Sequence, residues 1–292
     1  MTHATTPAPG AGLAAYGSDP RPGRMPHTPA DPPRRPPRHA ATGRRLPPLA
    51  PVGSLRRSVQ LFRAFTVEQT DPAYFYGLLA LDSVREASRW CDLDGATMVD
   101  VGGGPGYFAD AFTEAGARYA GIDPDAGELE RRGTVAGNTL RASGLALPVA
   151  DDVVDLAYSS NVLEHVPDPE AMVEEMVRIT RPGGTVVLSW TPWLSPWGGH
   201  ETAPWHYLGG RRAADRYARR HGHRPKNDFG RSLYDCSIAR MLTWLRAAER
   251  DGRVETVEVL PRYHPAWARW LIRVPLVREV ASWNAVVVLR VR

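Results

Sequence analysis

Apolar residues follow two spacings along this chain. From residue 54 to about 90 they recur at helical spacing, first at Leu55, Val59, Phe62 and Phe65, then within 72–90. Further on, short apolar runs alternate with helical ones. We expect strands at about 97–101, 118–123, 139–142, 154–159 and 185–190, and helices at about 107–115, 126–132 and 168–180. This alternation is typical of parallel β–α–β winding and predicts an α/β fold with a doubly wound, mostly parallel sheet.

The regular spacing breaks after the fifth predicted strand. Residues 191–235 contain tryptophan, glycine, histidine and arginine without clear periodicity, so we predict an irregular insertion there. A helix is expected to resume at about 237–250, followed by strands at about 254–260 and 285–291. Ligands of open α/β sheets bind beyond the carboxyl ends of the strands. The insertion should therefore form a lid over the ligand site.

The first 52 residues have a different composition. They carry about a dozen prolines together with Gly, Ala and Arg, and almost no large apolar side chain. Such a segment cannot offset the entropy lost on ordering, so we predict a disordered tail at 1–52 and a folded domain at 53–292. A translation start placed upstream of the true one would produce the same composition.

The net charge of +4 is unevenly distributed. Residues 1–57 hold nine arginines against Asp19 and Asp31, about +7, which leaves the remainder near −3. A folded body that is not basic argues against a nucleic-acid partner.

The two cysteines, Cys91 and Cys236, are far apart and outside any Cys–His cluster, so we expect no disulfide framework and no metal site. No apolar run approaches the roughly 18 to 20 residues that span a bilayer, and no secretory signal core is visible. These features predict a cytoplasmic protein.

A glycine-rich turn follows the first predicted strand and reads Asp100-Val101-Gly102-Gly103-Gly104-Pro105-Gly106-Tyr107. Glycines allow a sharp turn and close approach to a ligand, and the following helix presents free N–H groups, so we predict a nucleotide-like cofactor. The dinucleotide pattern is matched only in part, by Gly104, Gly106 and Ala109, which leaves a nicotinamide cofactor open. Asp123 ends the next strand, where its carboxylate can accept hydrogen bonds from ribose hydroxyls in either case.

The turn also fits D-x-G-x-G-x-G, and here the chain resembles the class I S-adenosylmethionine-dependent methyltransferases. Further segments that carry the resemblance are Ala142-Ser143-Gly144-Leu145-Ala146-Leu147-Pro148, Asp151-Asp152-Val153-Val154-Asp155, Ser159-Ser160-Asn161-Val162-Leu163-Glu164-His165-Val166 and Arg181-Pro182-Gly183-Gly184. They lie within about residues 95–190. The resemblance implies a Rossmann-like fold, S-adenosyl-L-methionine as the cofactor, and methyl transfer as the activity.

The resemblance also implies roles for individual residues. Asp100 would face the methionine end of the cofactor, whereas His165 fits a cofactor contact and a packed turn histidine equally well. Ser143 stands where the family usually has an aspartate, which weakens the expected contact with the adenine amine. The implied cofactor-binding residues are Asp100, Gly102, Gly103, Gly104, Gly106, Tyr107, Asp123, Pro124, Ser143, Gly144, Leu145, Asn161 and His165.

The predicted lid is rich in aromatic residues and histidines, which suits a small apolar or aromatic acceptor, such as a natural product, a quinone-like compound or a lipid. Tryptophans that simply pack the lid are the alternative. In-line displacement on a sulfonium needs alignment and exclusion of water, and a base is optional. The base candidates are His200, Glu201 and His206, and weaker acceptor-site candidates are Tyr207, Lys226, Asn227, Tyr263 and His264.

Other interpretations stay open. An NAD(P)-dependent oxidoreductase is the main rival, although the segment after strand four lacks Tyr-x-x-x-Lys; a regulatory module that binds adenosylmethionine without transfer is another. Trp267, Trp270, Leu271 and Ile272, beside several arginines, fit core packing better than a surface that meets lipid, and both are kept. The glycine-rich lid resembles uncharacterised actinobacterial methyltransferases, a likeness that supplies no substrate.

Overall fold

A seven-stranded sheet forms the centre of the computed structural model, which describes residues 46–125 and 138–292. The strand order is β3-β2-β1-β4-β5-β7-β6, with β1 to β5 parallel and β7 antiparallel to both of its neighbours. This confirms the predicted doubly wound, mostly parallel sheet. The strands are β1 (Thr97–Val101), β2 (Arg118–Asp123), β3 (Thr139–Arg141), β4 (Val154–Ser160), β5 (Thr180–Trp190), β6 (Val254–Pro261) and β7 (Ala285–Val291).

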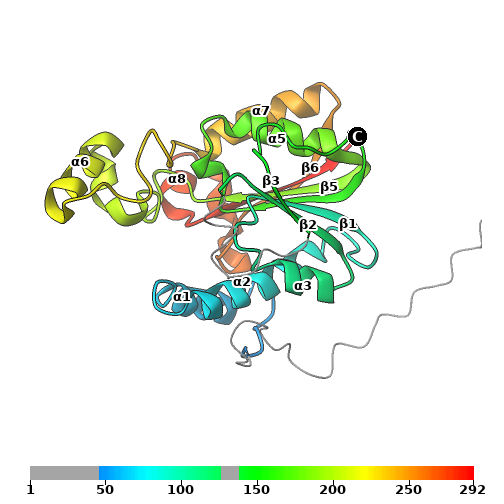
Figure 1. Ribbon diagram of the computed structural model, residues 1–292, viewed down its shortest axis with the longest axis horizontal. Coiled ribbons are helices and arrows are strands. Elements are labelled where there is room, and N and C mark those ends of the chain that lie inside the picture. Colours follow the sequence, from blue (N-terminus) through cyan, green and yellow to red (C-terminus); the bar gives the residue numbers. More distant parts are fainter. Residues whose placement is uncertain (1–45, 126–137) are drawn as a thin grey trace, which may run out of the picture. The chain divides into compact units, whose positions relative to one another are not determined.

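Helices cover both faces of the sheet, α1 to α3 on one face and α5 and α7 on the other (Figure 1). Each face has its own apolar core: Leu78 and Phe112 belong to the first, and Met176 and Met241 to the second. The helices are α1 (Leu55–Phe65), α2 (Pro72–Ala87), α3 (Ala109–Glu114), α5 (Pro169–Ile179), α6 (Gly210–His221), α7 (Ile238–Arg250) and α8 (Val277–Ala281).

Capping side chains place the starts of four of these helices. Ser54, Asp71, Asp168 and Ser237 each accept a hydrogen bond from a backbone N–H in the first turn of α1, α2, α5 and α7, respectively. Prolines follow two of these caps, at the first position of α2 and α5, where a missing N–H costs nothing. The helix boundaries are thus set by local sequence.

The ordered domain begins before the predicted boundary at residue 53. Leu46 and Leu49 are buried in the core under α1 and α2. The amide side chain of Gln60 accepts from the Ala50 N–H at 2.8 Å and donates to the Pro48 carbonyl at 3.0 Å. Two leucines thus suffice to pack a proline-rich segment of the predicted tail onto the domain. The rest of the predicted tail, 1–45, and the predicted helix at 126–132 lie outside the described residues.

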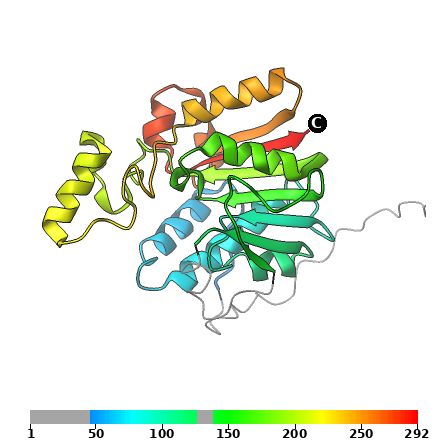
Figure 2. The same ribbon diagram turned by 45° about the horizontal axis from the view of Figure 1, so that its top comes forward.

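The predicted insertion at 191–235 is more regular than its sequence suggests. It holds two 3₁₀ turns, η2 (His200–Thr202) and η3 (Trp205–Leu208), and the helix α6. Helix α6 buries only Gly210, Ala213 and Ala214 and ends at Gly222, whose φ of 76° is left-handed. Small buried side chains leave no apolar periodicity, which is why the helix was missed. Figure 2 shows α6 at one end of the domain, away from the sheet.

Two apolar stretches face outward. In α1 the helical spacing is confirmed, but Leu55 is 59% exposed and the helix buries Arg57 and Leu61 instead. In the 3₁₀ segment η4 (Ala266–Arg273), Trp267 is 71% exposed and Trp270 50%. Core packing, the favoured interpretation of the segment from Trp267 to Ile272, is therefore wrong for the two tryptophans, whereas Ile272 is buried in the core. Among the described residues, no helix has both the length and the apolarity to cross a membrane.

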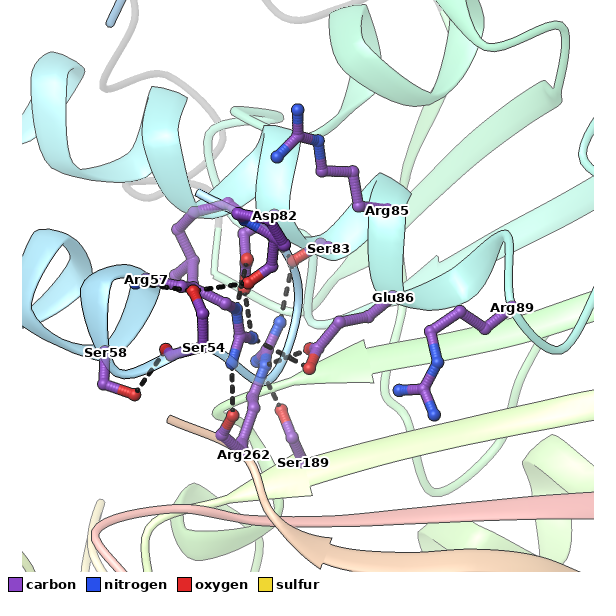
Figure 3. Close-up of polar contacts among 12 residues, drawn as sticks. Ser54, Arg57, Ser58, Asp82, Ser83, Arg85, Glu86, Arg89, Ser189 and Arg262 are labelled. Atoms are coloured by element: carbon purple, nitrogen blue, oxygen red, sulfur yellow. Dashed lines mark hydrogen bonds and ion pairs between the residues drawn. The ribbon is translucent and has the colours of Figure 1, made fainter. Parts of the chain in front are cut away.

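A buried ion cluster holds the N-terminal helices to the sheet (Figure 3). The Arg57 guanidinium donates to both carboxylate oxygens of Asp82 at 2.6 Å and to Oε1 of Glu86 at 2.8 Å. Its remaining nitrogen donates to the backbone carbonyl of Arg262 at 2.9 Å. Burial raises the pKa of Glu86, and the charge of Arg57 opposes that rise. One arginine of α1 thereby connects α2 with the end of β6.

Candidate functional site

The glycine turn after β1 depends on left-handed backbone and close packing. Gly102, Gly104 and Gly106 have φ values of 80°, 50° and 72°, which side-chain-bearing residues rarely adopt. A Cβ on Gly102 would lie 2.4 Å from a methyl carbon of Val162, in the segment that follows β4. The turn therefore packs closely against the segment that follows β4. A larger residue at Gly102 would clash with Val162 and would also strain the backbone.

Asp123, the last residue of β2, faces this turn. Its Oδ2 accepts a 3.0 Å hydrogen bond from the Gly104 N–H, and its Oδ1 accepts one from the Asp125 N–H at 2.9 Å. The side chain is buried, while Pro124 beside it is exposed. The two bonds hold the carboxylate at the glycine turn, where an acceptor for two hydroxyl groups was predicted.

Asp100 lies beneath the same turn. Its Oδ2 accepts a 2.7 Å hydrogen bond from the Tyr119 hydroxyl, and a Cβ on Gly103 would lie 3.1 Å from that oxygen. Burial raises the pKa of the Asp100 carboxyl to about 7, opposed by the Tyr119 bond and reinforced by the charge of Asp123. Two acids at one glycine turn form a site that a cationic ligand would stabilise.

Two further segments border the turn. Tyr107 stacks on Tyr76 of α2, with ring centroids 4.8 Å apart and planes 10° from parallel. On another side, a Cβ on Gly144 would lie 3.1 Å from Val101 at the end of β1. Beside it, the exposed Ser143 accepts the N–H of Leu145 through its hydroxyl at 3.1 Å. The residues predicted from separate motifs thus surround one turn.

The segment after β4 connects the glycine turn to the lid. Asn161 has a φ of 59°, and its Oδ1 accepts from Asn284 at 3.2 Å, which fixes its orientation. In the next turn, η1 (Leu163–His165), the backbone N–H of His165 donates to the Val162 carbonyl at 2.8 Å. Because Val162 packs on Gly102, η1 directly follows a residue that contacts the glycine turn.

His165 and His200 meet at this junction. Their ring centroids are 5.1 Å apart, and Nδ1 of His165 lies 2.8 Å from the carbonyl oxygen of Ser232. Burial, followed by the charges of His165 and Lys226, lowers the pKa of His200 to about 3. His200 is therefore a neutral imidazole at physiological pH.

Glu164 was missed by the sequence analysis and belongs to the same junction. It is buried, and its Oε1 accepts the Thr191 N–H at 3.0 Å. Each of Glu164, His165 and His200 offers a donor atom, and these atoms lie within 4.8 Å of one another. Nothing in the sequence marked Glu164, because a turn glutamate next to a histidine carries no spacing signal.

The other two base candidates lie near His200 in the lid, with Glu201 next to it in η2 and His206 against Gly199. His206 is buried against Trp193 and Tyr207, with ring centroids 5.2 and 4.1 Å away, and its Nε2 is 3.2 Å from the Ser195 carbonyl oxygen. Glu201 is exposed, and both of its carboxylate oxygens accept from the Asn227 amide at 3.1 Å. Of the three candidates, His200 is the one whose ring contacts His165.

The weaker candidates are scattered. Tyr207 and Lys226 are exposed. Burial raises the pKa of Tyr263 to about 12 and lowers that of His264, whose ring lies 5.2 Å from Trp283. Tyr207 belongs to η3 of the lid, whereas Tyr263 and His264 follow β6.

The buried side chain of Arg262 donates hydrogen bonds to hydroxyl groups near the ends of β4 and β5. One guanidinium nitrogen donates to the hydroxyls of Ser160 and Ser189 at 2.7 and 2.8 Å, and another donates to Ser83 and Tyr158 at 2.7 and 3.0 Å. Ser189 is the last but one residue of β5, and Asn161 hydrogen-bonds to its backbone carbonyl. The ion cluster described above therefore also supports the segment that carries Asn161.

Known proteins resemble this chain in sequence and in fold. The family described as methyltransferase domain matches residues 99–188. A methyltransferase of Mycolicibacterium gilvum is 53% identical over 252 residues, which covers 83% of this chain and 97% of the relative. One from Mycobacterium avium is 50% identical over 247 residues, with 81% and 96% covered. The crystal structure of an S-adenosylmethionine-dependent methyltransferase from Mesorhizobium loti has a TM-score of 0.50 at 24% identity and covers 74% of this chain and 97% of its own.

Proposed function

This chain belongs to the S-adenosylmethionine-dependent methyltransferases, and on that premise we propose that it methylates a small, apolar or aromatic acceptor bound between the glycine turn and the lid. The observation that carries the proposal is the pair of buried acids, Asp100 and Asp123, held at one glycine turn. A buried acid whose pKa is raised by desolvation is stabilised as a carboxylate by a neighbouring cation. The residues present therefore fit a cationic adenosyl cofactor.

Individual residues would contact different parts of that cofactor. Asp123 would accept hydrogen bonds from the ribose, Asp100 would face the methionine end, and the backbone of 143–145 would border the adenine. Tyr107, fixed by its stack on Tyr76, would close the turn from the side of α2. When bound, the cofactor supplies an electrophilic methyl group on a positively charged sulfur.

Aromatic contacts join the lid to the N-terminal helices. The Trp197 ring lies 6.4 Å from Phe62 and 5.2 Å from Phe65, measured between centroids. Trp193 packs on Phe229 at 4.5 Å inside the lid. Walls of this kind exclude water and favour an apolar or aromatic ligand. They support the acceptor class proposed here.

His200 is the acceptor-site residue that we favour of the three base candidates. Its position beside His165 puts it next to the segment that packs on the glycine turn. A neutral imidazole offers one lone pair, which can orient the acceptor's hydroxyl or amine either directly or through a bound ion. This assigns His200 a positioning role toward the ionisable group of the acceptor.

Transfer of isotope-labelled methyl groups tests the proposal. The full chain is incubated with methyl-labelled S-adenosylmethionine and fractions of metabolite and lipid extract, and the labelled product is identified by mass spectrometry. We expect label in a small apolar or aromatic compound. Tight binding of the cofactor without label in any fraction would favour the regulatory module, and uptake of a nicotinamide cofactor instead would favour the oxidoreductase.

We also propose that the surface around η4 makes peripheral contact with lipid. Trp267 and Trp270 are exposed beside Arg273, and Leu276, directly after this segment, is 76% exposed. Exposed tryptophans next to cationic side chains are typical of surfaces that insert at a lipid–water interface. Such a contact would suit an acceptor drawn from a membrane.

A further inference from the structure

Three side chains with metal-binding atoms meet where the segment after β4 contacts the lid. Glu164 and His165 come from η1, and His200 comes from η2 in the lid. One donor atom from each lies within 4.8 Å of the donors of the other two. Two ligands from one segment and a third from a distant one would tie these two segments together.

The hydrogen bonds of η1 orient its two side chains as ligands. Nδ1 of His165 is 2.8 Å from the Ser232 carbonyl oxygen, a contact that requires the proton on Nδ1 and leaves the lone pair on Nε2. A backbone carbonyl in this role is the usual partner of a metal-binding histidine. Oε1 of Glu164 accepts the Thr191 N–H at 3.0 Å, which fixes the carboxylate plane.

Two buried atoms of the cluster have no protein partner. Oε2 of Glu164 and Nε2 of His200 make no hydrogen bond with any residue that the structure describes, and Glu164 is 1% exposed. A buried carboxylate oxygen and a buried imidazole nitrogen are costly to leave unpaired. Both are electron-pair donors, so one cation between them would satisfy both.

We propose that Glu164, His165 and His200 bind a divalent transition-metal ion, with Zn²⁺ as the best-matched class. Two imidazole nitrogens and one carboxylate oxygen form a donor set that suits this ion. Donors about 2.1 Å from one tetrahedral ion lie about 3.4 Å apart, so side-chain movements of about 1.4 Å would close the cluster. Three protein ligands leave one position open.

The open position gives the metal a role at the acceptor site. The turn that holds Glu164 and His165 packs on the glycine turn through Val162 and Gly102. An oxygen, nitrogen or sulfur atom of the acceptor bound to the metal would thus lie beside the cofactor turn. This role rests on the proposed function, whereas metal binding itself does not.

Cobalt binding tests the site directly. The full chain is freed of metal with a chelator and titrated with Co²⁺, whose visible absorption bands are strong in sites of four or five ligands. We expect one ion per chain, and an affinity lowered at least tenfold in both His200→Ala and Glu164→Gln. His223→Ala, which removes an exposed histidine outside the cluster, should bind as the wild type does.

Each outcome bears on the proposal. Equal Co²⁺ affinity in the wild type and His200→Ala, or loss of the bands only in His223→Ala, would overturn it. If Glu164→Gln does not fold, as judged by circular dichroism, His200→Ala decides the question. Calorimetry with S-adenosylhomocysteine in the absence of metal tests the cofactor site separately, so failure of one proposal can be told from failure of the other.

Discussion

The backbone N–H of Gly104 donates a 3.0 Å hydrogen bond to Oδ2 of Asp123, which joins the glycine turn after β1 to the last residue of β2. The contact follows from the register of the two strands, in which Val101 pairs with Ile122. Parallel neighbours therefore end at one edge of the sheet, and the acid of one strand reaches the turn of the other. Two motifs separated in the sequence thus meet at one edge of the sheet, where we propose that the cofactor binds.

Replacing Asp123 should weaken cofactor binding. In Asp123→Ala we expect the affinity for S-adenosylmethionine to fall by about 1.5–3 kcal/mol, because charge-assisted hydrogen bonds to the ribose are lost. Isothermal titration calorimetry measures the change. Asp125→Ala, which removes an exposed acid two residues further on, is the control and should bind normally. Equal affinity in Asp123→Ala and the wild type would contradict the ribose assignment.

Cofactor affinity should depend on pH through Asp100. Its carboxyl has a pKa of about 7 in the free protein, so it is mostly protonated at pH 6 and mostly ionised at pH 8. A cationic ligand prefers the ionised form, and affinity should therefore rise over this interval, by up to about tenfold per pH unit below the pKa. Calorimetry at several pH values should show the rise in the wild type and a flatter profile in Asp100→Asn. The same slope in both would assign the titration to another group.

The same carboxyl should make the free protein less stable as pH rises. Its folded-state pKa is raised by burial above the unfolded value of about 3.9, so its stabilising contribution is complete below pH 4 and is lost between about pH 4 and 7. Without cofactor, Asp100→Asn should melt at a higher temperature than the wild type at pH 8 and at a similar one near pH 4. Calorimetric melting curves check this, and a lower melting temperature at pH 8 would refute it.

Removing Arg57 should destabilise the whole domain. Arg57→Ala would leave the buried carboxylates of Asp82 and Glu86 without their main cation, and we expect a loss of about 3–5 kcal/mol in the free energy of unfolding. Urea denaturation measures this loss. Arg56→Ala alters an exposed arginine of the same helix and should change stability by less than about 0.5 kcal/mol. A loss in Arg57→Ala as small as that in Arg56→Ala would contradict the prediction.

Lipid contact should depend on Trp267. Trp267→Ala is expected to reduce binding to vesicles of phosphatidylglycerol and phosphatidylcholine about tenfold, since burying an aromatic side chain contributes roughly 1.5 kcal/mol. Cosedimentation measures binding, and the melting temperature should hardly change because the side chain is 71% exposed. Trp205→Ala removes a partly exposed tryptophan from the lid and serves as the matched control. If the wild-type protein does not cosediment with the vesicles, the proposed lipid contact is ruled out.

The strands and the glycine turn could be predicted because their signals are local. β1, β2 and β7 have the predicted limits to within a residue, since compact apolar runs bounded by glycine or charged residues mark a buried strand. Helix α6 could not be found, because Ala213 and Ala214 pack on neighbours without any apolar stripe. The local pattern of apolar residues shows which side chains are buried only where those side chains are large.

The sequence alone determined the positions of most strands and the glycine turn of this protein, because apolar runs and glycine conformation follow from short-range rules of chain geometry. The tertiary structure alone decided that His200 lies beside His165 and Glu164, that Arg57 is buried, and that Leu55 and Trp267 face outward. Each of these depends on which surface another segment covers. Contacts between segments that are distant in the sequence produce no periodic pattern in either segment, so the sequence alone does not reveal them.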